Sequence, residues 1–293
     1  MKIILNPKYE RLRDYLTHID FHFEQEGKEI FRDRNVVRTL RVDGLTLCVK
    51  RYAPLSLRGN LAIRLYKTSK GKKAYFKPFK LRERGFESPE PVAFVCYRKG
   101  LFSSVIYLVC LQSTYRYSLD RIMDFSENER REITRRFASF AARLHNDGFL
   151  HRDFSASNIL FDKVDNRYHF ALIDTNSLRT GHPVSIERGC RNLSQLIGDE
   201  DFFKVLADTY ANARNADAAT CLQHTSCRRK GETDSTCKRL EKDPLPRVFK
   251  IEISKVSGSA LAAEICTGPH NRLLRRQHCS SCLLYTSPSP RDA

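Results

Sequence analysis

The sequence lacks a long apolar run. No stretch reaches the ~18 consecutive apolar residues that a membrane-spanning helix needs. Its start, MKIILNPKYERLRDY, has only three apolar residues in a row after the first lysine, which is too few for a secretion signal. At 293 residues, 41% hydrophobic and 29% charged, the chain is typical of a soluble protein with one large or two smaller domains. We therefore expect a cytoplasmic protein whose thiols are reduced.

Acidic side chains are also scarce. Asp and Glu number 34 against 51 Lys and Arg, giving a formal net charge of +17, which predicts an acidic partner. A nucleic acid, an anionic membrane surface and a phosphorylated substrate all qualify. Residues 58–84 hold ten Lys or Arg and one acid, Glu83, although such a segment can also be a solvated helix face. No nucleic-acid-reading motif accompanies the charge, so we do not expect a nucleic-acid partner.

Regular patterning is missing from the last part of the chain. Six of the ten cysteines lie after residue 219, where the amphipathic periodicity also ends. CSSC at 279–282 has no second pair that would complete a zinc site. Residues 282–292, CLLYTSPSPRD, resemble one reading frame of a widely used transposase sequencing adapter. We expect residues 220–293 to be a frameshifted or adapter-derived tail, and the domain to end near Ala219 with its own C-terminus truncated.

The first 112 residues predict a small antiparallel sheet with one inserted helix. NVVRTLRVDGLTLCVKRY contains the strong hairpin signal Asp-Gly at 43–44, and its second strand is expected to end at Lys50. A basic helix is predicted over residues 61–84, ended by Gly85. Residues 88–111 then read as two more strands, because prolines mark the entry to an alternating apolar run.

The second half opens with a predicted amphipathic helix in SENERREITRRFASFAARLHNDGF. Ser126 and Glu129 form a capping box at its start, and Gly148 ends it. One apolar face recurs at helical spacing, made by Ile133, Phe137, Phe140, Ala141 and Leu144. NILF and YHFALID predict short strands around the turn DKVDNR, and DEDFFKVLADTYANARNA predicts a further helix.

Polar side chains are concentrated in the loop between that helix and the first short strand. In LHRDFSASN, Asp153 and Asn158 are five residues apart and can face one pocket. The strand that ends in ALIDTN supplies a second carboxylate, Asp174, sixteen residues after the asparagine. Two carboxylates and an amide are oxygen ligands suited to magnesium, which also binds substrate phosphates.

This stretch resembles a known family. HRDFSASN, a strand and then IDTN are similar to the kinase pattern H-R-D-x-x-x-x-N followed by D-F-G. With VKRY ahead of the basic helix, and LRERG and PEPVA after it, the sequence resembles the lipopolysaccharide core kinases of the Kdo/WaaP group over residues 30–200. The resemblance implies an α+β, protein-kinase-like fold of two lobes. Residues 1–112 would form an N-lobe with a small antiparallel sheet, and residues 113–219 a mainly helical C-lobe.

The resemblance also assigns roles. Asp153 would be the catalytic base that accepts the proton of the attacking hydroxyl. Asn158 and Asp174 would hold Mg²⁺ against the β- and γ-phosphates of ATP, and Lys50 would contact the α- and β-phosphates. His151 and Arg152 would support the loop.

The sequence departs from the kinase pattern at three places. FRDRNVVR stands before Lys50 where a G-x-G-x-x-G loop would cover the phosphates, and DTN replaces D-F-G. Phe76 stands where the inserted helix of the family often carries the glutamate that pairs with the lysine. Glu83 and Glu87 come late for that role, so an inactive kinase stays an alternative.

Three functions are compatible with these features. The first is an enzyme that phosphorylates a sugar hydroxyl, of Kdo or heptose, in a lipopolysaccharide core or another phosphorylated glycolipid. It would work at the inner face of the cytoplasmic membrane, with the basic segment against anionic lipid. The second is an atypical, RIO-like protein kinase. The third is a non-catalytic pseudokinase module at an acidic membrane surface.

Overall fold

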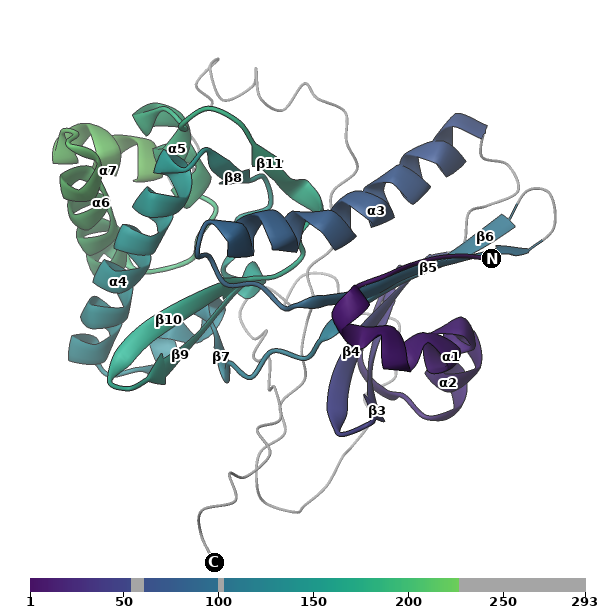
Figure 1. The fold of residues 1–293 in the computed structure, drawn as a ribbon. Coiled ribbons are helices and arrows are strands. Elements are labelled where there is room, and N and C mark those ends of the chain that lie inside the picture. The colour runs from purple at the N-terminus through teal and green to yellow at the C-terminus, as the bar shows by residue number, and fades with distance from the viewer. Residues whose placement is uncertain (54–60, 100–102, 227–293) are drawn as a thin grey trace, which may run out of the picture.

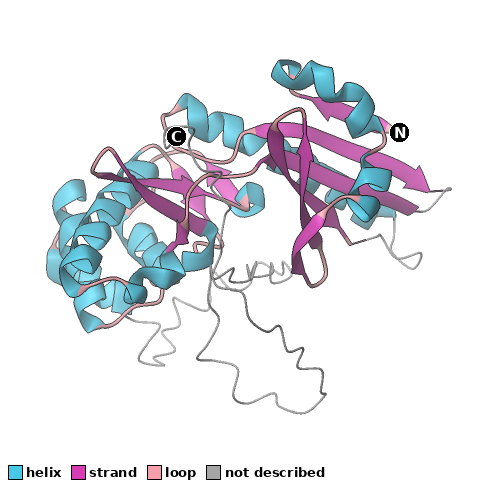
Figure 2. Cartoon of the chain, turned by 90° about the horizontal axis from the view of Figure 1, so that it is seen from below, coloured by secondary structure: helices cyan, strands magenta, loops and turns pink. Residues whose placement is uncertain are grey.

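The chain folds into two lobes joined by a short linker (Figure 1). The computed structural model describes residues 1–53, 61–99 and 103–226. The first lobe, here the N-lobe, is built on an antiparallel sheet, and the second, the C-lobe, is mainly helical (Figure 2). This arrangement confirms the α+β, kinase-like fold that the sequence predicted.

The N-lobe sheet has six strands in the order β1-β5-β6-β4-β3-β2, and every neighbouring pair is antiparallel. The predicted hairpin joins β3 to β4 through Asp43 and Gly44, whose positive φ angles of 48° and 72° are those of a tight hairpin turn. Strand β4 continues to Tyr52, two residues beyond its predicted end. The strands are β1 (Lys2–Leu5), β2 (Lys28–Arg32), β3 (Val36–Val42), β4 (Leu45–Tyr52), β5 (Pro91–Lys99) and β6 (Ser103–Leu111).

Helices cover both faces of this sheet. On one face lie three short helices that the sequence did not predict, η1 (Pro7–Leu12), α1 (Arg13–Thr17) and α2 (Ile19–Gln25). They form one hydrophobic cluster with strand residues that include Leu47 and Val49.

On the other face lies the predicted basic helix, α3 (Leu61–Glu83), which packs against β5 and β6. A Cβ on Gly71 would come within 2.7 Å of the Phe94 ring, so a glycine lets the helix approach the sheet. The chain leaves α3 through Gly85, whose φ is 72°.

The C-lobe is organised around helix α4 (Glu127–Asn146), which begins at the predicted Ser126–Glu129 capping box. Its five predicted core residues are all buried. The predicted strands form a hairpin closed by two residues with positive φ, Asp165 and Asn166. The strands are β7 (Tyr117–Ser118), β8 (Phe149–His151), β9 (Ile159–Val164), β10 (Arg167–Leu172) and β11 (Leu178–Thr180). The helices are η2 (Leu119–Asp124), η3 (Ala156–Asn158), η4 (Thr175–Ser177), α5 (Ile186–Leu193), α6 (Glu200–Arg214) and α7 (Ala218–Ser226).

Helix α7 corrects the boundary that the sequence suggested at Ala219. The helix crosses that position, and its Cys221 and Thr225 are fully buried. Cys221 belongs to the hydrophobic core of the C-lobe, so packed structure continues beyond residue 219. The rest of the predicted tail of residues 220–293, from 227 onward and including the CSSC motif, lies outside the described residues. Within the described part of the chain, no helix is both long and apolar enough to span a bilayer.

Candidate active site

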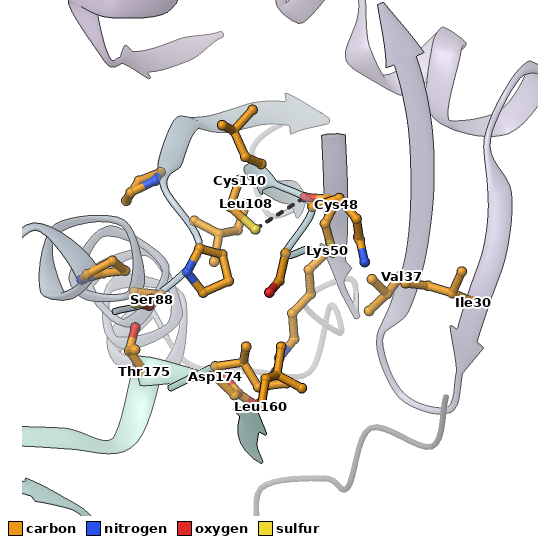
Figure 3. Close-up of a pocket in the computed structure, with 18 residues that line it drawn as sticks. Ile30, Val37, Cys48, Lys50, Ser88, Leu108, Cys110, Leu160, Asp174 and Thr175 are labelled. Atoms are coloured by element: carbon orange, nitrogen blue, oxygen red, sulfur yellow. Dashed lines mark hydrogen bonds and ion pairs between the residues drawn. The ribbon is translucent and has the colours of Figure 1, made fainter. Parts of the chain in front are cut away.

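A pocket lies between the two lobes, under the N-lobe sheet (Figure 3). Its walls are mostly apolar and come from both lobes: Val37, Cys48, Leu108 and Cys110 from the sheet, and Leu160 and Ile173 from the C-lobe. Gln112 and Ser113, from the linker between the lobes, also line it. The Oε1 atom of Gln112 is buried and has no hydrogen-bond partner among the described residues. Apolar walls with a few polar groups at one edge suit a flat heterocyclic base.

Lys50 and Asp174 meet at the pocket, as Figure 3 shows. Lys50 reaches from β4, and its Nζ lies 3.1 Å from Oδ2 of Asp174. Both side chains are largely buried, with 13% and 3% of their surface exposed. Burial alone would lower the pKa of Lys50, but the carboxylate of Asp174 outweighs it and the pKa is raised. The lysine therefore stays charged and available to phosphate oxygens.

Among the described residues of α3, no glutamate pairs with Lys50. The residues by which α3 lines the pocket are Ala74 and Pro78, and Phe76 is 48% exposed. Glu87 accepts a hydrogen bond from the Tyr115 hydroxyl and also contacts His169. In the described part of the chain, Asp174 is thus the carboxylate that pairs with Lys50.

His151 supports the loop that carries Asp153 and Asn158. This residue is fully buried, and its Nε2 lies 3.2 Å from the carbonyl oxygens of both Ile173 and Asp174, to which it can only donate. Burial lowers the pKa of His151, so the ring stays neutral. Asn192 donates to the His151 carbonyl at 2.9 Å. The predicted supporting role of His151 agrees with these contacts.

Asp153 and Asn158 face each other across this loop. The Nδ2 of Asn158 donates to the Asp153 backbone oxygen at 3.0 Å, which fixes the turn between them. Burial raises the pKa of Asp153, and the charge of Asp174 adds to this effect. A carboxylate with a raised pKa is a better proton acceptor than an exposed one.

The oxygens fit a magnesium ion. The Oδ1 atom of Asn158 is buried and finds no hydrogen-bond partner among the described residues, so a ligand would satisfy it. With the Asp174 carboxylate it offers the hard oxygen donors that Mg²⁺ prefers. Within the described ranges no group of three His, Cys, Asp or Glu could hold a metal by itself. Water and phosphate oxygens would have to complete the coordination shell.

Three polar residues at this site were not predicted as functional. Asn176, two positions after Asp174, contacts the carboxylate of Asp174, and both Tyr52 and Lys77 contact Asn176. In the sequence, Asn176 is the final residue of IDTN, and DTN was interpreted only as a departure from D-F-G.

Comparisons with known proteins show what this chain is similar to. Residues 77–197 match the model of the lipopolysaccharide kinase (Kdo/WaaP) family. This match confirms the resemblance to Kdo/WaaP-like kinases that the sequence indicated. A solved structure described as WaaP in complex with acyl carrier protein is similar in fold, with a TM-score of 0.53 and 17% sequence identity. The similarity covers 80% of this chain and 100% of that one. No curated protein sequence matches significantly.

Proposed function

We propose that this chain, with its Kdo/WaaP-like segment, transfers the γ-phosphoryl group of ATP to a sugar hydroxyl of a lipopolysaccharide core. The observation that carries the proposal is the ion pair of Lys50 with Asp174 at the inter-lobe pocket. Asp153, which is hydrogen-bonded through its backbone to Asn158, lies close enough for both charges to act on its pKa. The family match supports the lipopolysaccharide kinase class. Kdo or heptose is the acceptor sugar that we propose.

Each residue would act on a different part of the reaction. The base of ATP would occupy the apolar pocket, and Lys50 would hold its α- and β-phosphates as a compact charge. Asn158 and Asp174 would hold Mg²⁺, which neutralises charge on the β- and γ-phosphates. Asp153 would orient the acceptor hydroxyl and take its proton as the oxygen attacks phosphorus. Positioning and charge stabilisation would therefore supply most of the rate enhancement.

The positive charge of the protein surface supports a proposal for the acceptor and for the membrane beside it. Lys73 and Lys80 are exposed on α3 next to Phe76, a suitable surface for an anionic lipid or a sugar phosphate. We propose peripheral contact with the inner face of the cytoplasmic membrane through this surface. The structural neighbour was solved with an acyl carrier protein, and a carrier protein is a further candidate partner.

The test is transfer of labelled γ-phosphate to purified lipopolysaccharide core, with a protein acceptor assayed in parallel. We expect label in the sugar that depends on Mg²⁺ and is absent with an Asp153→Asn variant. Label in protein alone would instead support a RIO-like protein kinase. Tight ATP binding without transfer to either acceptor would support a pseudokinase. This is the second candidate because Lys50 pairs with Asp174, and not with a glutamate of α3, among the described residues.

A further inference from the structure

Asn176 lies at the junction of the two lobes, and both polar atoms of its side-chain amide make hydrogen bonds there. Its Nδ2 donates to Oδ1 of Asp174 at 2.5 Å, while Oδ2 of the same carboxylate contacts Lys50. Its Oδ1 accepts from the Tyr52 hydroxyl at 3.3 Å. Asn176 is only 9% exposed, so water contributes little to satisfying these groups.

Two residues of the N-lobe therefore bind Asn176. Tyr52 follows Lys50 by two positions on β4. Lys77, on α3, donates from Nζ to the Asn176 backbone oxygen at 2.7 Å. The contact between α3 and η4, which begins one residue after Asp174, brings the helix to this carbonyl.

The backbone of Asp174 makes this support necessary. Its φ is 49°, a left-handed conformation that an aspartate adopts only at some cost. His151 holds its carbonyl oxygen, and Asn176 and Lys50 each hold one oxygen of its carboxylate. Without Asn176, the Oδ1 atom of this carboxylate would lose the hydrogen bond that fixes its direction.

We propose that Asn176 is a positioning residue that couples the N-lobe to the metal-binding carboxylate, with Tyr52 and Lys77 as its N-lobe partners. In this chain the bond between α3 and the loop of Asp174 takes the place of a lysine–glutamate pair within the N-lobe. Approach of α3 and β4 to the C-lobe would then fix the direction of the Asp174 oxygens. This inference rests on the proposed function, because it assigns Asp174 to the metal.

The test uses the full chain and three variants, Asn176→Ala, Tyr52→Phe and Lys77→Met. Binding of a fluorescent ADP analogue is measured with and without Mg²⁺, together with kcat and the KM for ATP. Tyr97→Phe is the matched control for Tyr52, because it removes a hydroxyl that donates to the Thr17 carbonyl away from the site. Lys204→Met is the control for Lys77, since it removes an exposed lysine of α6 that pairs only with Glu200 on the surface among the ion pairs of the described residues.

Asn176→Ala should lower the Mg²⁺-dependent nucleotide affinity and kcat by about 10-fold to 100-fold, the usual effect of losing a residue that orients a metal ligand. The losses caused by Tyr52→Phe and Lys77→Met should lie toward the lower end of that range. Nucleotide affinity without Mg²⁺ should stay within about twofold, as should all parameters of both controls. Tyr52→Phe added to Asn176→Ala should cause no further loss, because the partner hydroxyl has nothing left to bind.

Equal losses of affinity with and without Mg²⁺ would show a merely structural role and overturn the inference. So would additive effects of the Tyr52 and Asn176 variants. Mg²⁺-dependent binding by the wild-type chain with unchanged variants would reject the positioning role while leaving the proposed function intact. Absence of Mg²⁺-dependent binding by the wild-type chain would reject the proposed function, and this inference with it.

Discussion

At the scale of single residues, Asp153 separates chemistry from binding. Asp153→Asn keeps the size of the side chain but removes its ability to take a proton. We expect turnover to fall by about 10² to 10⁴, the usual contribution of general base catalysis. ATP affinity should change little, because Asp153 is assigned to the acceptor rather than the nucleotide. Single-turnover phosphoryl transfer and nucleotide binding measure the two effects, and unimpaired transfer by this variant would remove Asp153 from the mechanism.

The raised pKa of Asp153 predicts the acidic side of the pH–rate profile. A general base works only when deprotonated, so kcat/KM should fall as the pH drops through this pKa. Since burial raises it, the fall should begin at a higher pH than the ~3.9 of an exposed aspartate would give. Circular dichroism over the same pH range separates this effect from acid unfolding. A profile that stays flat down to the pH of unfolding would contradict the assignment.

Candidate residues that belong to a local motif could be identified from the sequence, whereas the contacts that join them to distant segments could not. Asp153 and Asn158 lie in one loop, so their spacing in the sequence was enough to place them together. Lys50 and Asp174 are 124 positions apart, and the sequence directed attention to a glutamate on α3. Asn176 was missed for the same reason, because its N-lobe partners are far away in sequence.

At the scale of elements, the residue before strand β7 is tied to β9 by an ion pair. Arg116 donates to both oxygens of Asp162, which is 6% exposed. Burial alone would raise the pKa of Asp162, but the hydrogen bonds from Arg116 and two backbone amides lower it. Asp162→Asn should reduce the free energy of unfolding at neutral pH by about 2 kcal/mol, the scale of hydrogen bonds to a buried charge.

The sign of the pH dependence follows from that lowered pKa. The stabilisation is fully present above the unfolded pKa of ~3.9 and is lost as the pH falls through the folded value. The difference in the free energy of unfolding between wild type and Asp162→Asn should therefore shrink only at acidic pH. Urea unfolding at several pH values measures this difference. Asp124→Asn, which affects an exposed pair with Arg121, is the control and should have a much smaller effect.

Strands β4 and β6 place two thiols in the inter-lobe pocket, where we propose that the nucleotide binds. Cys48 and Cys110 are direct partners across the strands, and both line the pocket. A hydrogen bond with Cys110, helped by the charge of Lys50, lowers the pKa of Cys48. Saturating Mg²⁺-ATP should slow alkylation of Cys48 by about 100-fold at a hundred times Kd, since only the free protein reacts. Mass spectrometry measures the rate, with buried Cys190 as the internal reference.

Elements with strong local patterns were predicted well, and those fixed by distant pairing were not. The β3–β4 turn, the capping box of α4 and the glycine after α3 are signals within a few residues. Strand β1 has only four residues and pairs with β5, about ninety positions away, so nothing nearby identifies it. Helices α1 and α2 are shorter than isolated helices can be in water, and their packing on the sheet stabilises them.

At the scale of the whole molecule, α7 completes the core of the C-lobe. A chain that ends at Ala219 loses buried Cys221 and Thr225, while one that ends at Ser226 keeps them. Loss of these contacts opens the core beside α5 and α6, with which α7 packs. We expect the shorter chain to have a melting temperature lower by about 5 °C or more, as loss of 1–2 kcal/mol would give. Equal melting temperatures of the two chains would instead support a domain boundary at residue 219.

The two-residue turn between β3 and β4 has a consequence for how this lobe can vary. Side chains alternate between the faces of a strand, so Cys48, Lys50 and Tyr52 share the cleft face while Leu47 and Val49 share the other. Asp43 and Gly44 set the register of that alternation. One residue inserted there, if absorbed by sliding β4, would turn the lysine into the apolar cluster and valine toward the phosphates. A change of length at this two-residue turn would therefore reach the site directly, through the register of β4.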